Sequence, residues 1–330
     1  MRYRTLGSHG PSVSEIGFGG WALGGEWGAQ DDAESIRALR TAVDCGVNFI
    51  DTAAGYGDGR SERLIAQLLA SLPPSERPLV ATKTPPSAGP WPPSPHCRWE
   101  DRYGAAYLRD NVEQRLRNLG VERLDLLQLH TWTRAWNDDP QPLLVLRRLR
   151  EEGKLGLIGV STPEQDQNCV VQLMRDGLVD VVQVIFNLFH QEPLAQLLPV
   201  AAETGTGVII RVPLDEGVLS GKYAADHRFP EDDFRHRYFA GDRLRRAVHR
   251  VAAIEEDLQR LGLGEPLSLV DLALKFALAP PPVSTVVVGM RTAAQAQQNA
   301  AASELPNLTP EMLALLARHN WLRGVWYAGK

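Results

Sequence analysis

Four polar residues that could carry out acid–base chemistry lie at or just past the ends of short apolar runs. Asp51 and Tyr56 follow the second run, Lys83 ends the third, and His130 follows the fourth. In a barrel of alternating strands and helices, the carboxyl ends of all strands meet at one rim. Residues distant in sequence can form one site there, and we expect these four to do so.

The chemistry that suits this set is the reduction of a carbonyl group by hydride, which needs a proton donor at the developing alkoxide. A phenol, with an ordinary pKa of about 10, is a poor donor at neutral pH unless a nearby cation lowers that pKa. Lys83 can supply the cation for Tyr56, and Asp51 can hold the ammonium in place. His130 can orient the carbonyl oxygen or share its charge.

The elements that must position these residues follow a repeated pattern. The predicted strands are Ile16 to Gly20 and the runs NFID, LVATK, LDLLQLH, LIGVS, VVQVIFN, GVIIRV and STVVVG. Stretches of helical periodicity lie between them, PEQDQNCVVQLMRDG among them, which predicts parallel strands with helices outside. Eight such units favour an α/β fold of the closed (β/α)8 TIM-barrel type, and we expect residues 1–330 to form one domain.

Three longer stretches interrupt this rhythm, and a short one precedes it. Residues 84–103 and the segment from Leu214 to near Gly262 directly follow strands, so they should lie on the carboxyl-end rim, where binding loops belong. The third stretch is the tail after Asn307. The residues before Ile16 read as two extended pieces around a turn, which predicts a hairpin that caps one end of the barrel.

The composition indicates which classes of partner and which cell compartment to expect. Acidic residues number 40 against 35 Lys and Arg, for a net charge of −5, and no dense basic run is present; we therefore expect no nucleic-acid partner. Cys45, Cys97 and Cys169 are widely spaced and lack metal or redox spacing, which suits a reducing cytoplasm. The start MRYRTLGSHG has no apolar signal core and no stretch is long enough to span a bilayer, so we expect a soluble, cytoplasmic protein without a membrane partner. The oligomeric state stays open.

Seven segments resemble, in order, the successive signatures of the aldo-keto reductase family: NFIDTAAGYGDGRSERLIAQLL, ATK, LDLLQLH, GVS, QVIFN, PLDEGVLSGKY and VVVGMRTAAQAQQN. The likeness implies a (β/α)8 barrel that binds NADPH across the rim and reduces an aldehyde or ketone, such as a sugar or an aromatic carbonyl. It also implies that Tyr56 is the general acid, that Lys83 and Asp51 tune it, and that His130 positions the substrate. No GxGxxG lies in a strand–turn–helix context, in line with the lack of a Rossmann domain.

The resemblance further implies which residues contact the cofactor. Asp51 is among them, with Gly20 and Trp21 near the nicotinamide ribose and Ser161 and Gln183 at the carboxamide. The loop that wraps the pyrophosphate is matched by Leu214, Gly217, Leu219, Gly221 and Lys222. The segment that holds the adenosine and its 2′-phosphate is matched by Gly289, Met290, Arg291, Gln295, Gln298 and Asn299.

Two arginines bear on how the cofactor would bind. Arg211 stands where many members of the family carry an aromatic residue that stacks on the nicotinamide. A planar guanidinium can stack as well, but it adds a charge. Arg291 is available to pair with a 2′-phosphate, which favours NADPH over NADH.

The eight tryptophans all fall outside the predicted helices: Trp21, Trp27, Trp91, Trp99, Trp132, Trp136, Trp321 and Trp326. The family resemblance places the tail over the pocket, so all eight could gather on one face and wall a deep pocket suited to a flat ring or the apolar face of a sugar. Simple hydrophobic plugging of the barrel mouth is an equally good interpretation.

Two other functions fit the same barrel. One is a non-catalytic, nucleotide-sensing regulatory subunit, a role that this fold plays as the β-subunit of potassium channels. The other is a lyase that forms a Schiff base on Lys83. Taken singly, Asp51 could cap a strand end and His130 could be a core histidine; it is their combination with the GxGxSE spacing after Tyr56 that favours the reductase.

Overall fold

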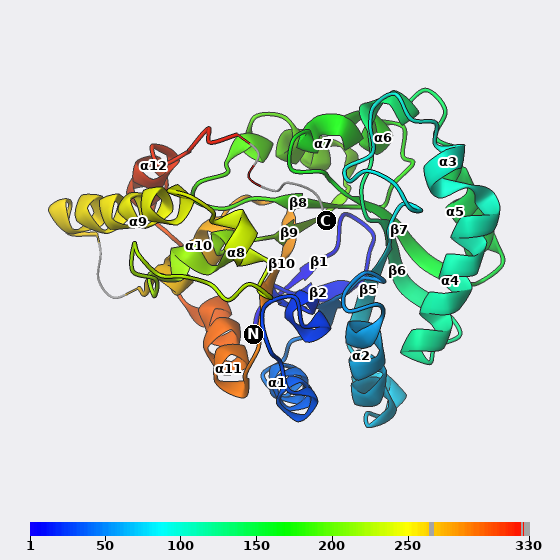
Figure 1. Ribbon diagram of the computed structural model, residues 1–330, viewed down its shortest axis with the longest axis horizontal. Helices are drawn as coiled ribbons and strands as arrows, with labels where there is room; N and C mark the ends of the chain where they lie inside the picture. Colours follow the sequence, from blue (N-terminus) through cyan, green and yellow to red (C-terminus); the bar gives the residue numbers. More distant parts are fainter. Residues whose placement is uncertain (264–266, 325, 327–330) are drawn as a thin grey trace.

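Eight parallel strands form a closed barrel in the computed structural model, which describes residues 1–263, 267–324 and 326. The strand order is β10-β3-β4-β5-β6-β7-β8-β9 (Figure 1). The strands are β3 (Ile16–Gly19), β4 (Phe49–Asp51), β5 (Leu79–Thr84), β6 (Leu124–Leu129), β7 (Leu155–Ser161), β8 (Val181–Ile185), β9 (Gly207–Arg211) and β10 (Val283–Gly289). The predicted (β/α)8 fold and its eight predicted strands are confirmed.

The predicted hairpin closes the amino end of the barrel. Strands β1 (Tyr3–Thr5) and β2 (Ser12–Ser14) pair antiparallel. Leu6 and Val13 pack against inward-facing apolar side chains of the barrel strands, among them Phe49 and Leu126. This apolar plug leaves the opposite rim as the end where polar side chains gather.

Helices surround the barrel (Figure 1). They are α1 (Asp32–Asp44), α2 (Arg60–Ala70), α4 (Ala105–Leu119), α5 (Gln141–Glu151), α6 (Val171–Arg175), α7 (Leu197–Thr204), α10 (Leu269–Leu278) and α11 (Ala293–Ala301). Local signals explain their ends: the Asp31 side chain accepts from the Glu34 amide at the start of α1, and Gly120 takes a left-handed conformation after α4. None of the helices in the described part of the chain is long and apolar enough to cross a membrane.

The helical stretch predicted over PEQDQNCVVQLMRDG is shorter than expected. Its first half forms only a 3-10 turn, Gln167–Val170, and α6 follows. The Gln167 amide is buried and bonds both backbone groups of Ile185 at the end of β8. That long-range pairing holds the segment in a tight turn, which periodicity alone does not reveal.

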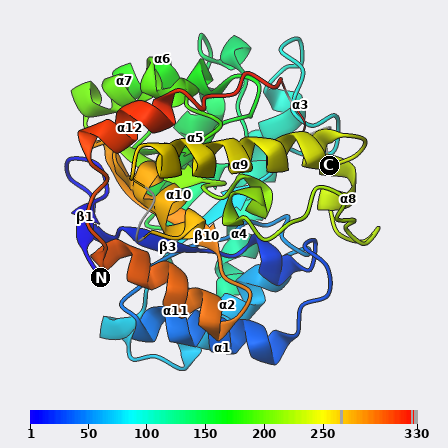
Figure 2. The ribbon, with the colours of Figure 1, turned by 90° about the vertical axis from the view of Figure 1, so that its left-hand side faces the viewer.

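The long stretches that interrupt the pattern cover the carboxyl-end side. Residues 84–103 include α3 (Glu100–Tyr103), and the stretch after β9 includes η6 (Asp215–Ser220), α8 (Arg235–Tyr238) and α9 (Arg243–Arg260). Helix α12 (Pro310–Ala317) lies beside α9 (Figure 2). Beyond α12, the Trp321 amide bonds Phe189 O, and the chain reaches the rim at Arg323. The tail therefore covers the rim as expected, within the part that the structure describes.

A buried ion pair ties α2 to α4 and to the strand that carries Lys83. Glu62 pairs with Arg115 at 2.8 Å and accepts hydrogen bonds from Thr82 (2.6 Å) and Asn118 (2.7 Å). Both charged side chains are almost fully buried. Removing one partner of such a pair leaves the other charge desolvated and unpaired.

We predict that Glu62→Ala lowers the free energy of unfolding by about 3–5 kcal/mol, the usual cost of breaking a buried ion pair. Urea unfolding followed by circular dichroism measures this. The control is Glu152→Ala, which breaks the exposed Arg109–Glu152 pair and should cost at most about 1 kcal/mol. Equal losses in the two variants would contradict the prediction.

Candidate active site

Asp51 and Lys83 form a buried ion pair at the carboxyl ends of two neighbouring strands. Asp51 ends β4 and Lys83 is the fifth residue of β5, which pairs with β4 in parallel. The Lys83 ammonium donates to both oxygens of Asp51, at 2.8 and 2.6 Å, and to Thr52 O at 2.9 Å. The two side chains are 1% and 6% exposed, so the ammonium is held in one position and shielded from water.

Tyr56 is placed over this pair by the turn after β4. The Ala54 amide donates to Lys83 O, and Tyr56 N donates to Ala53 O. Gly57 has a positive φ, and a Cβ there would lie 2.4 Å from Gly24 O, so only glycine lets the two loops approach this closely. As a result the Tyr56 hydroxyl lies 3.4 Å from the Lys83 ammonium, close enough for the cation to act on it.

His130 completes the group from β6. It directly follows that strand, and its amide donates to Thr84 O at the end of β5. Its ring meets the ring of Tyr56 edge-on, with centroids 5.9 Å apart, and that of Trp91 at 5.2 Å. The structure thus brings the four predicted catalytic residues together, although their roles remain predictions.

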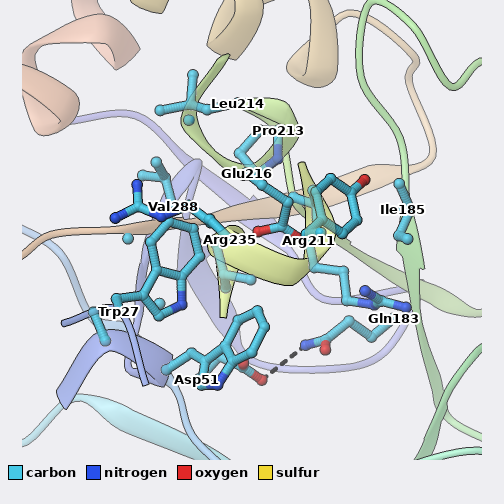
Figure 3. Close-up of a pocket in the computed structure, with 18 of the residues that line it drawn as sticks. Trp27, Asp51, Gln183, Ile185, Arg211, Pro213, Leu214, Glu216, Arg235 and Val288 are labelled. Carbon is cyan, nitrogen blue, oxygen red and sulfur yellow. Dashed lines mark hydrogen bonds between the residues drawn. The ribbon is translucent and has the colours of Figure 1, made fainter. Parts of the chain in front are cut away.

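Two further strands reach the same carboxylate. Gln183 on β8 donates to Asp51 at 2.7 Å, the bond dashed in Figure 3. Gln128 on β6 approaches Asp51 at 3.4 Å, and Ser161 on β7 lies 3.5 Å from Gln183. Asp51 therefore links the rim ends of β4, β5, β6 and β8. The predicted carboxamide contacts of Ser161 and Gln183 are not tested by this arrangement.

A cavity of about 480 Å³ opens beside the four residues, within the range of ligand pockets. Asp51, Tyr56 and His130 line it. The predicted cofactor residues that also line it are Trp21, Ser161, Gln183, Arg211, Leu214, Gly217, Lys222, Gly289, Arg291, Gln295, Gln298 and Asn299. Residues on β3, β4, β7, β8, β9 and β10 thus meet at one cavity.

Four predicted cofactor residues do not line the cavity. Leu219 and Met290 have side chains buried in the core. A Cβ at Gly20 would lie 2.8 Å from Asp51 O, and Gly221 ends η6 with a φ of +72°. These four residues shape the loops around the cavity, and direct cofactor contact through them remains a prediction.

One end of the cavity is built from amides and a cation at the start of α11. Gln295 accepts from the backbone amide of Arg291, and Asn299 donates to Gly289 O. The Arg291 guanidinium donates to Gln30 at 2.9 Å and to Ala29 O at 2.7 Å, which fixes its position. A cation beside a helix amino terminus is suited to an anionic group.

The wall formed by the loop after β9 carries several charges. Arg211 donates to Thr162 O at 3.0 Å, while its buried Nε has no hydrogen-bond partner among the described residues. Arg323 from the tail makes a two-pronged ion pair with Asp215. Burial, and next the Asp215 charge, raise the pKa of Glu216 to about 8.

Several cavity-lining residues were missed by the sequence analysis: Glu164, Glu216, Arg235, Tyr238 and Arg323. Glu216 lies inside the segment PLDEGVLSGKY, so its place beside Leu214 and Gly217 could have identified it. Arg235 and Arg323 fall in the long segments expected at the rim, but the sequence gives no sign of which side chains there turn inward.

The model of the Aldo/keto reductase family matches residues 15–320 of the chain. The chain belongs to this family. It is accordingly an NAD(P)H-dependent oxidoreductase, in agreement with the family resemblance found in its sequence.

Known members of the family align along nearly the whole chain. Aldo-keto reductase YhdN of Bacillus subtilis is 29% identical, covering 89% of this chain and 86% of its own. The NADH-specific methylglyoxal reductase of Escherichia coli is 25% identical, covering 92% and 93%. A solved glycerol dehydrogenase from Gluconobacter oxydans superimposes with a TM-score of 0.73 at 27% identity, covering 99% and 98%.

The tryptophans of this aldo-keto reductase divide into separate groups. Trp21, Trp27 and Trp91 line the cavity. Trp132 and Trp136 are buried against each other. The remaining three pack elsewhere: Trp99 donates to Asp139, and Trp321 and Trp326 contact each other. The expectation that all eight wall one pocket is therefore wrong for five of them, which fill space between rim loops instead.

We predict that the Asp51–Lys83 pair shows strong coupling in a double-mutant cycle. Lys83→Met leaves a buried carboxylate without its counter-charge and should cost about 3–5 kcal/mol of unfolding free energy. Adding Asp51→Asn should make the double variant lose at least about 1 kcal/mol less than the two single losses combined. Urea unfolding of the four proteins without ligand measures the coupling.

The matched control is the exposed pair Arg98–Glu100, for which a cycle with Arg98→Met and Glu100→Gln should give a coupling below about 1 kcal/mol. If the losses at Asp51 and Lys83 simply add, the pair is not the interdependent unit described here.

Proposed function

We propose that this enzyme reduces the carbonyl group of an aldehyde or ketone to the alcohol, with hydride from NADPH and a proton from Tyr56. One observation carries the proposal. The Tyr56 hydroxyl lies at the cavity surface, 3.4 Å from an ammonium that Asp51 holds in place. A phenol in this position can lose its proton because the fixed cation stabilises the phenolate that forms.

The residues divide the work in the following way. The nicotinamide, when bound, supplies the hydride to the carbonyl carbon. Tyr56 gives its proton to the carbonyl oxygen, and Lys83 neutralises the resulting phenolate. His130 directly follows β6, and its ring meets that of Tyr56 edge-on. From there it positions the same carbonyl oxygen. By microscopic reversibility, the same residues serve alcohol oxidation.

The substrate class follows from the lining of the cavity. Trp21, Trp27 and Trp91 supply apolar ring faces and edges, while His130 and Tyr56 supply polar groups. Indole surfaces next to hydrogen-bonding groups suit the apolar face of a sugar or a flat aromatic carbonyl. The names of two relatives, a methylglyoxal reductase and a glycerol dehydrogenase, support a small oxygenated substrate.

We infer NADPH as the preferred cofactor from Arg291. Its guanidinium is fixed by Gln30 and Ala29 at the end of the cavity where α11 begins. A 2′-phosphate there would meet a cation and a helix amino terminus together.

The three described cysteines are free thiols, which supports the reducing cytoplasm as the place of action.

Tyr56→Phe should lower kcat at least about a hundred-fold, because general acid catalysis contributes about 10²- to 10⁴-fold. The Kd for NADPH should stay nearly unchanged, since the ring remains. Loss of NADPH absorbance with a panel of sugars, aromatic aldehydes and small ketones measures turnover. The control, Tyr3→Phe at the capped end of the barrel, should not change it.

Retained turnover in Tyr56→Phe would reject the assigned acid. A wild-type protein that binds NADPH tightly but turns over no carbonyl compound would favour the nucleotide-sensing regulatory subunit instead. Trapping of a substrate on Lys83 by borohydride, without any need for nicotinamide, would favour the lyase.

Arg291→Ala should raise the Kd for NADPH roughly ten- to hundred-fold more than the Kd for NADH. The reason is that only NADPH loses the charge-assisted hydrogen bonds to its 2′-phosphate. The ratio of the two constants is the readout, because loss of the Gln30 and Ala29 contacts affects both cofactors. Titration of protein fluorescence gives both constants. An unchanged ratio would remove the basis for preferring NADPH.

A further inference from the structure

Glu216 is a buried acid on the wall of the cavity. Glu216 lines the cavity, but only 6% of the residue is exposed. Among the described residues, no hydrogen bond or salt bridge satisfies its carboxyl group. Figure 3 shows it on the same wall as Arg211, above Asp51. A buried acid that the described residues leave without a hydrogen bond is suited to a bound ligand.

The backbone around Glu216 is strained. Val212, Asp215 and Glu216 all have positive φ angles, of 57°, 46° and 55°, which are rare for residues with a side chain. The turn persists because Gly217 N and Leu219 N both donate to Leu214 O. Strain of this kind is retained at ligand clamps more than elsewhere. Two independent features therefore place a ligand contact at this turn.

The neighbouring charges decide the form in which Glu216 acts. Asp215 is paired with Arg323 and Arg235 with Asp233. Arg211 and Glu164 also face Glu216, with opposite effects on its pKa. Burial and the Asp215 charge outweigh the two arginines and raise the pKa to about 8, so the group is largely a neutral acid at pH 7.

We propose that Glu216 binds the diphosphate of the nucleotide cofactor as a carboxylic acid, donating its proton in a hydrogen bond to a diphosphate oxygen. The inference rests on the proposed function and on the family resemblance, which implies that the loop from Leu214 to Lys222 wraps that diphosphate. Lys222 and Gly217 of the same loop line the same cavity. An ionised Glu216 would instead repel a diphosphate, so cofactor affinity depends on its proton.

The sign of the pH dependence follows from linkage. A hydrogen bond from the protonated acid to an anion raises the pKa of Glu216 in the complex above its value of about 8 in the free protein. Affinity is therefore complete below about pH 8 and falls as the pH rises toward the pKa in the complex. The limiting slope for one proton is about ten-fold in Kd per pH unit.

The test is the Kd for NADPH between pH 6 and 9.5, from titration of protein fluorescence, in the wild type and in Glu216→Gln. The wild-type Kd should rise above pH 8, by up to about ten-fold per unit, while that of Glu216→Gln should stay flat, because an amide is a neutral donor at every pH. The control Glu231→Gln, at an exposed position in the same stretch, should follow the wild type.

Calorimetry in two buffers of different ionisation enthalpy gives a second readout that needs no variant. NADPH binding to the wild type at pH 9 should take up protons, up to about one per site, and Glu216→Gln should take up fewer. The wild-type measurement holds even if the variant folds poorly, since zero proton uptake there would overturn the proposal.

The outcomes separate this proposal from the proposed function. A wild type that binds no NADPH at any pH defeats the proposed function itself. Tight binding with the same pH profile in wild type and Glu216→Gln overturns only the role of Glu216. If the variant changes the KM for the carbonyl compound and leaves the cofactor profile unaltered, Glu216 faces the substrate, and the proposal is likewise overturned.

Discussion

The buried contact between Lys83 and Asp51 is the constraint on which the rest of the site depends. An ammonium and a carboxylate that are this well shielded from water gain little net stability from each other, because desolvation offsets most of their attraction. Their value is geometric. Since neither can lose its partner without a large cost, the ammonium keeps one position, and the Tyr56 hydroxyl above it has a fixed cation at 3.4 Å.

The closed barrel is what makes this fixed position possible. Asp51 accepts hydrogen bonds from Gln183 on β8 and Gln128 on β6, besides the ion pair with β5. These strands meet at one carboxylate only because the sheet closes on itself. At the opposite end, the apolar plug of Leu6 and Val13 fills the barrel. The two ends therefore differ in role: the plugged end stabilises the barrel, and the carboxyl-end rim holds the polar cluster around Asp51.

The sequence predicted what depends on local pattern. Each barrel strand is a short apolar run, so all eight could be located, and Lys83 and His130 could be placed at strand ends because parallel strands share a direction. The short helix α6 escaped prediction because Gln167 pairs with Ile185 eighteen positions away. Local periodicity carries no trace of such a bond.

The rim loops were harder for the same physical reason. Arg323 meets Asp215 across more than a hundred residues, and nothing in either local sequence indicates that pairing. The tryptophans show the same limit of sequence-based prediction. Their positions in loops were evident, but packing between segments that are distant in sequence decides whether an indole faces the cavity or a neighbouring loop. Trp91 and Trp132 both follow strands, yet only the first lines the cavity.

The charges around the cavity explain how its acidic residues can coexist with an anionic ligand. Three carboxylates are matched by cations of the protein: Asp51 by Lys83, Asp215 by Arg323, and Asp233 by Arg235. Each pair cancels a negative charge near the cavity. Arg211, Lys222 and Arg291 also lie along its lining, where Arg211 and Arg291 are held by neutral acceptors instead of an acid. A buried acid that keeps its proton adds a donor to this lining without adding a charge, so the chain can retain acids at the rim while the cavity stays suited to phosphate groups.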